Sequence, residues 1–130
     1  MEWKNVPKDI SKYQGFVYII KNKVNDKYYI GKKFFWKKKT LPPLKGKKNQ
    51  RHSRVESDWK DYWGSCNNLL LDIEKYGKKS FDRIILKVCF TKFDCAYDEL
   101  LYQIQYDVLN DSLAYNEIIS VRLRKRKPKE

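Results

Sequence analysis

Two short runs of aromatic and β-branched residues near the start of the chain constrain its fold most strongly. The first run is Phe16–Ile20 and the second is Tyr28–Gly31, and the polar residues 22–27 lie between them. Such runs on either side of Asn- and Asp-containing segments are typical of two strands joined by a turn. The sequence therefore predicts a β hairpin here.

The rest of the chain shows alternating signals for helix and strand. Apolar residues recur at helical spacing over 65–76, where Gly77 ends the pattern. A buried third strand is expected over 81–90, and a second helix from Thr91 or Asp94 to about residue 110. We therefore expect an α/β (α+β) fold with a three-stranded, mainly antiparallel sheet flanked by helices.

The remaining segments carry many basic residues and no regular pattern. Residues 37–54 contain Pro42, Pro43 and Gly46 among their lysines and arginines, which predicts a long basic loop. Residues 122–130 are expected to form a disordered basic tail. Because 130 residues suit one domain, we expect a single domain over 1–121.

Several classes of protein are excluded by composition. No apolar run approaches the roughly 18 residues of a membrane span, and the N-terminus lacks a signal-peptide pattern. Three cysteines without a CxxC pair favour reduced thiols, and one histidine, His52, cannot build a multi-histidine metal site. No GxxxxGK[ST] loop is present. We expect an intracellular, cytoplasmic protein.

The positive charge is concentrated in two segments. The chain has 29 Lys and Arg against 16 Asp and Glu, a net charge of +13. Residues 31–60 carry +9 and residues 121–130 carry +5, whereas 91–120 carry −5. Phosphate is the common partner of such clusters, and Phe34, Phe35 and Trp36 beside the lysines suit stacking on bases. The alternatives are a solubilising surface, above all for the tail, and an anionic membrane, for which no amphipathic pattern is present.

The predicted hairpin carries a recognisable motif. Gly15-Phe16-Val17-Tyr18 is followed, after ten residues, by Tyr29-Ile30-Gly31-Lys32, which resembles the signature of the GIY-YIG nuclease family. Further features follow in the family's order: Lys75-Tyr76-Gly77, a strand from Phe81, a helix with Glu99, and Tyr115-Asn116. Residues 56–65 resemble the small phage-encoded members of the homing type.

The resemblance implies a DNA endonuclease that leaves 5′-phosphate and 3′-hydroxyl ends, acting in a phage-infected cell. It implies that Glu99 holds one Mg²⁺ or Mn²⁺ ion, a hard cation that prefers oxygen ligands. Tyr18 and Tyr29 would polarise or deprotonate the attacking water, which requires positive charge nearby to favour a phenolate. Gly31 would let the backbone approach DNA, and Lys32 would bind phosphate. The residues that the resemblance implies for binding phosphate or DNA are Gly31, Lys32, Lys33, Lys39, Arg51 and Asn116.

Two positions depart from the family pattern. The family's first motif places a glycine two residues before the tyrosine, whereas that position is Phe16 here and Gly15 lies one residue earlier. Lys39 stands where the family has an arginine, and a lysine cannot form a bidentate guanidinium clamp. Arg51 or Arg54 could replace it, and we prefer Arg54 because it adjoins the segment 56–65. The larger homing enzymes append a separate DNA-recognition domain, for which we expect no room after residue 121. We therefore expect specificity to come from the basic loop, the tail or a second subunit, in a monomer or a homodimer.

Two other functions remain open from the sequence. A basic nucleic-acid-binding module of the same fold without turnover fits the missing arginine. An RNA-binding or ribosome-associated protein fits the charge but leaves the paired tyrosines unexplained.

Overall fold

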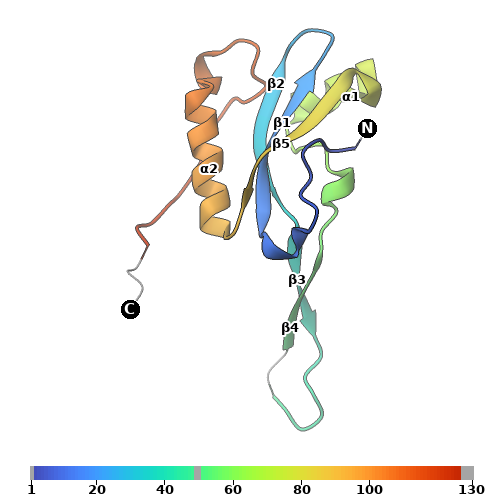
Figure 1. The fold of residues 1–130 in the computed structure, drawn as a ribbon, viewed down its shortest axis with the longest axis vertical. Coiled ribbons are helices and arrows are strands. Elements are labelled where there is room, and N and C mark those ends of the chain that lie inside the picture. Colours follow the sequence, from blue (N-terminus) through green and yellow to red (C-terminus); the bar gives the residue numbers. More distant parts are fainter. Residues whose placement is uncertain (1, 49–50, 127–130) are drawn as a thin grey trace.

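The computed structural model describes residues 2–48 and 51–126, with residues 51 and 52 described by their backbone alone. Within these residues the chain forms two α-helices, a three-stranded sheet and a separate two-stranded sheet, together with short 3-10 helices (Figure 1). In chain order the elements are β1 (Gly15–Asn22), β2 (Tyr28–Phe34), β3 (Trp36–Leu41), β4 (Arg51–Glu56), α1 (Asn67–Tyr76), β5 (Phe81–Cys89) and α2 (Lys92–Gln105).

The larger sheet has the strand order β2-β1-β5, and both pairings are antiparallel. In the predicted hairpin, Tyr18 lies opposite Gly31 and Ile20 opposite Tyr29. The predicted fold class, a three-stranded antiparallel sheet with flanking helices, is confirmed. The strand that is buried on both faces is the central β1, whereas the outer strand β5 alternates between buried and partly exposed residues.

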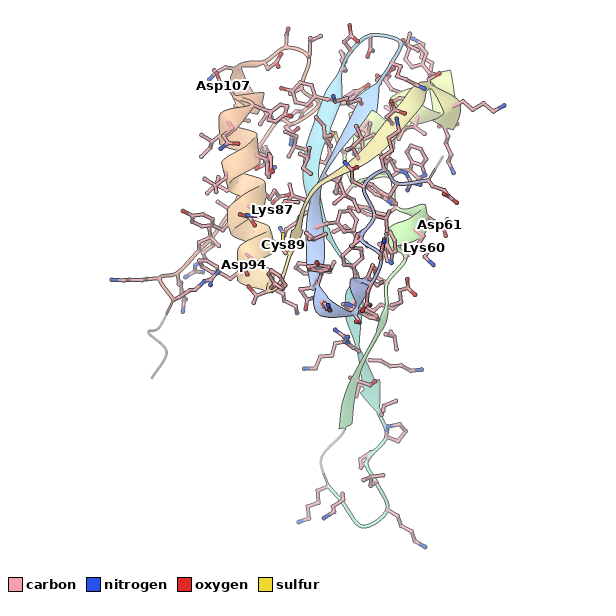
Figure 2. All side chains as sticks on the ribbon, in the orientation of Figure 1. Lys60, Asp61, Lys87, Cys89, Asp94 and Asp107 are labelled. Atoms are coloured by element: carbon pink, nitrogen blue, oxygen red, sulfur yellow. The ribbon has the colours of Figure 1, made fainter. Side chains whose placement is uncertain are left out.

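Successive side chains of β1 point to opposite faces of the sheet and belong to two separate hydrophobic clusters. Phe16, Tyr18 and Ile20 pack on the side of α1, whereas Val17 and Ile19 pack on the side of α2. Figure 2 shows Lys87 and Cys89 of β5 beside α2, with Lys60 and Asp61 on the other side of the sheet. The sheet is thus the middle layer of three (Figure 1).

The sequence signals correctly predicted the C-terminal end of α1 and the N-terminal end of α2. Gly77 ends α1 with a φ of 85°, a conformation that suits glycine. At the start of α2, the Thr91 side chain accepts a hydrogen bond from the Asp94 backbone N–H at 3.0 Å. α2 ends at Gln105 rather than near residue 110, because Asp107 adopts a left-handed conformation with a φ of 52°.

The loop predicted over 37–54 is wrong at both of its ends, where residues 37–41 and 51–54 form strands, whereas residues 42–48 have no helix or strand. Residues of β3 pair with β4 in an antiparallel hairpin, from Trp36 opposite Glu56 to Leu41 opposite Arg51. We call residues 36–48 and 51–56 the arm; it extends away from the rest of the protein (Figure 1). The four central residues of β3 are exposed, so the strand has no alternation of apolar and polar residues that would predict it from sequence. Backbone hydrogen bonds between β3 and β4 form the hairpin instead.

The C-terminal segment has no helix or strand over 122–126. Arg126 forms an ion pair with Asp94, and its guanidinium lies 4.2 Å from the ring centre of Phe93. Residues 127–130 lie outside the described part, so the predicted disorder of the tail is not tested there. Within the described ranges, no helix has the length and apolar character needed to cross a membrane.

Candidate active site

An open groove of about 380 Å³ lies along the β2 edge of the sheet. Residues from β1, β2 and α2 that are distant in the sequence meet in it. The predicted site residues that line the groove are Tyr18, Tyr29, Lys32, Lys33 and Glu99.

The alternation of β2 explains why one groove receives side chains from both layers. Tyr29, Gly31 and Lys33 lie opposite Ile20, Tyr18 and Phe16, on the α1 side. Lys32 lies opposite Val17, on the side of α2. The groove therefore spans an edge strand, with the tyrosines on one side of it and Glu99 on the other.

The glycine opposite Tyr18 on β2 leaves the space that the Tyr18 hydroxyl occupies. A Cβ on Gly31 would lie 2.6 Å from the Tyr18 hydroxyl oxygen, a distance that real side chains do not tolerate. Gly64, with a φ of 89°, has the same oxygen 3.5 Å from the position of its missing Cβ. At Gly31 the backbone can lie this close to the hydroxyl only because the position lacks a side chain, whereas the distance at Gly64 is an ordinary van der Waals contact.

Burial keeps both phenols protonated. Tyr18 is 1% exposed, and this burial, followed by the neighbouring Tyr62 and Tyr29, raises its pKa well above the usual 10. Burial and the charge of Glu99 raise the pKa of Tyr29 to about 12, against an opposing hydrogen bond from Ser65. In the protein without ligands, the charges around these phenols favour the neutral forms rather than a phenolate.

Glu99 meets Lys32 across the edge of β2. Its Oε1 lies 3.3 Å from the Lys32 Nζ, and the Glu99 side chain is 18% exposed. Burial raises the pKa of Glu99, while the ion pair with Lys32 acts in the opposite direction. The carboxylate can therefore titrate closer to neutrality than an exposed glutamate.

The donors in the groove suit a hard cation only in part. Glu99 supplies carboxylate oxygens, and no cluster of three or more His, Cys, Asp or Glu side chains exists among residues 2–48 and 53–126. Mg²⁺ commonly binds through one or two carboxylates and completes its coordination with water and substrate phosphates. The groove fits that mode and not an all-protein cage.

The segment 56–65 contributes residues that the sequence argument did not single out. Tyr62 lines the groove and packs edge-on against Tyr18, with ring centres 6.1 Å apart. Lys33 Nζ lies 2.7 Å from Asp58 Oδ1 and 4.2 Å from the Tyr62 ring centre. The resemblance of this segment to phage-encoded enzymes was the signal that could have identified Tyr62.

Three other predicted residues lie outside the groove. The exposed Arg54 lies on the arm, where it stacks on Trp36 at 4.1 Å and donates to the Ser11 carbonyl at 3.1 Å. Lys39 is exposed on β3. Asn116 is buried; its Oδ1 accepts from the Ile30 N–H at 3.1 Å, and its Nδ2 donates to the Ile30 carbonyl at 2.8 Å.

The side-chain amide of Asn116 is therefore engaged by the backbone of β2. The side chain of Arg51 lies outside the described residues. Among the side chains that are described, no arginine lines the groove, and Lys32, Lys33 and Lys37 are its cations.

Comparisons with known proteins agree with the geometry. A family model described as "Putative endonuclease segE, GIY-YIG domain" matches residues 2–119, nearly the whole chain. No curated protein and no solved structure matches the chain.

Proposed function

This chain belongs to the SegE family of GIY-YIG endonuclease domains, and we propose on that premise that it is a metal-dependent enzyme that cuts DNA. The observation that carries the proposal is the meeting of Tyr18, Tyr29 and Glu99 in one groove with Lys32 and Lys33. Three elements must fold together to place these groups, and a purely structural role does not require them to share a solvent-open hollow.

The lysines are placed to bind the phosphodiester. Lys32 and Lys33 extend from β2 on opposite sides of the edge strand, so both can approach a phosphate group that lies along it. Gly31, which directly precedes these two lysines on β2, keeps the backbone free of a side chain at this point. Cationic donors here would stabilise the charge that develops on the phosphate oxygens.

The tyrosines are placed to orient the attacking water. In an in-line displacement, the water oxygen bonds to phosphorus while the bond from phosphorus to the 3′-oxygen breaks, and the 3′-oxygen takes up a proton. Tyr29, the more accessible of the two phenols, would hydrogen-bond the water and accept its proton in the phenolate form. Tyr18, which is buried against Gly31, would orient Tyr29 and Tyr62.

Glu99 would hold a Mg²⁺ or Mn²⁺ ion, which supplies positive charge to the reacting phosphate when bound. A Glu99 carboxylate engaged in this way no longer needs Lys32 as its partner. Lys32 would then be free to bind a phosphate oxygen.

The ends left by this displacement are a 5′-phosphate and a 3′-hydroxyl. The endonuclease description of the matching family supports this activity, and the resemblance of residues 56–65 supports a homing-type role in a phage-infected cell. The proposed cellular partner is DNA.

A nicking assay on supercoiled plasmid with Mg²⁺ tests the proposal. Tyr29→Phe and Glu99→Gln should each lower the nicking rate at least ~100-fold, the scale on which general-base and metal contributions act. The matched controls are Tyr97→Phe and Glu74→Gln, which change exposed residues outside the groove and should cut like the wild type. Wild-type rates in both groove variants would overturn the assignment.

A second candidate, a DNA-binding module without turnover, is favoured by one observation. No arginine lines the described part of the groove, and Lys32 is engaged by Glu99. The same preparation distinguishes the two functions: a binding module retains plasmid in a gel shift with EDTA but yields no nicked product with Mg²⁺ or Mn²⁺.

A further inference from the structure

A second hollow adjoins the candidate active site at the base of the arm. It measures about 290 Å³, and we call it the arm-base pocket. Its lining residues are Gln14, Trp36, Lys37, Lys38, Ser53, Arg54 and Lys92. Four of the seven are cations and none is a carboxylate. Trp36 and Lys37 also line the groove, so the two hollows are adjacent.

The cations of this pocket differ from those of the groove in their ion pairing. In the groove, Lys32 is paired with Glu99 and Lys33 with Asp58. None of the ion pairs among the described side chains involves the cations of the arm-base pocket. An anion entering the arm-base pocket therefore displaces no carboxylate.

The pairing of the arm places two of these cations face to face. Lys38 lies directly opposite Arg54 in the β3–β4 register. Like charges at directly opposed positions destabilise a β pair, and an anion bound between them would remove that repulsion. The other described cations of β3 face neutral partners, with Lys37 opposite Val55 and Lys39 opposite Ser53.

Arg54 is also held in position before any ligand binds. Its guanidinium stacks on the Trp36 indole at 4.1 Å, and Nη2 donates to the Ser11 carbonyl at 3.1 Å. A guanidinium has five N–H donors, so this single hydrogen bond leaves donors for an oxyanion. Stacking on the ring lowers the entropic cost of fixing a long side chain.

We propose that the arm-base pocket, through Lys38, Arg54 and Lys92, binds a backbone phosphate of the DNA that flanks the phosphate in the groove. A DNA strand that crosses Trp36 and Lys37 contacts both hollows, because these two residues line each of them. The inference rests on the proposed function for the identity of the ligand. In this proposal Arg54 binds DNA outside the groove and does not replace the family's arginine in catalysis.

Binding to a duplex oligonucleotide in EDTA, measured across a series of salt concentrations, tests the inference without any need for cleavage. Arg54→Ala combined with Lys92→Ala should weaken binding about tenfold and reduce the salt slope of log Kd by about one, the value for one lost phosphate contact. The control pair Lys21→Ala and Lys79→Ala removes the same charge from exposed positions outside both hollows and should leave the slope unchanged. A slope equal to that of the control pair would overturn the inference.

Single-turnover cleavage separates this inference from the proposed function. Lys92→Ala should require more DNA for half-maximal rate, yet its rate at saturating DNA should stay within about threefold of the wild type. An Arg54→Ala variant that binds normally but has lost cleavage would overturn the inference and return Arg54 to catalysis. A wild-type protein that never cuts DNA would refute the proposed function, while the binding result in EDTA would still decide the inference.

Discussion

At the scale of single residues, the protonation of Tyr29 and Glu99 sets the conditions under which the groove can act. Both groups are partly withdrawn from water between the edge strand and its neighbours. The pKa of each is raised, so each holds its proton to a higher pH than an exposed side chain of its kind. Both proposed roles, as proton acceptor and as metal ligand, require the deprotonated form.

The cleavage rate should therefore rise with pH. Below the Tyr29 pKa of about 12, the phenolate fraction grows about tenfold per pH unit, and deprotonation of Glu99 acts in the same direction at lower pH. Single-turnover rates at saturating Mg²⁺ between pH 6 and 9 should show this increase. Tyr29→Phe should lose the slope as well as the rate; a flat wild-type profile would contradict the role of Tyr29 as a base.

The sequence motifs predicted correctly which tyrosine, lysine and glutamate side chains share the groove, but the arginine that they favoured, Arg54, lies outside it. Tyr18, Tyr29 and Lys32 are fixed by hairpin register, which follows from sequence spacing, and Glu99 lies on a helix whose cap was recognisable. Arg54 depends on the pairing register of the arm, and no hydrophobic pattern encodes that register. Asn116 depends on a contact with Ile30, 86 residues away in the chain.

At the scale of elements, the arm is the largest difference between expectation and structure. Buried elements leave an apolar pattern in the sequence: α1, with one buried face, leaves a periodic pattern, and β1, buried on both faces, leaves a continuous apolar run. The arm buries little beyond its base, where Trp36 donates to the Tyr13 carbonyl at 2.9 Å. Its basic composition indicated a polyanion contact but not a β hairpin.

The arm should supply much of the affinity for DNA. Replacing Lys45, Lys47 and Lys48 with glutamine removes three exposed charges near its end, and should weaken duplex binding at about 100 mM salt by tenfold or more while leaving thermal stability unchanged. Filter binding and thermal melting measure the two effects. Glutamine at Lys8, Lys21 and Lys79 provides the control with the same change in net charge; equal weakening in both triple variants would show that only total charge matters.

At the scale of the whole molecule, the charge is divided between two regions. The segment 31–60, which contains the arm, carries +9, whereas the segment 91–120, which contains α2, carries −5. Of the six acidic residues in the latter segment, Glu99 is the one that lines the groove. Because DNA is negatively charged, this division of charge would orient the protein with the arm and the groove edge toward DNA and the outer face of α2 away from it.

Mapping the ends cut from a defined, end-labelled duplex tests most directly whether the groove formed by Tyr18, Tyr29 and Glu99 severs DNA. With Mg²⁺, the wild type should yield 5′-phosphate and 3′-hydroxyl ends, and chelation of the metal, Tyr29→Phe or Glu99→Gln should each abolish them. Cleavage that persists in EDTA, 3′-phosphate products, or unchanged product yields from both variants would contradict the account.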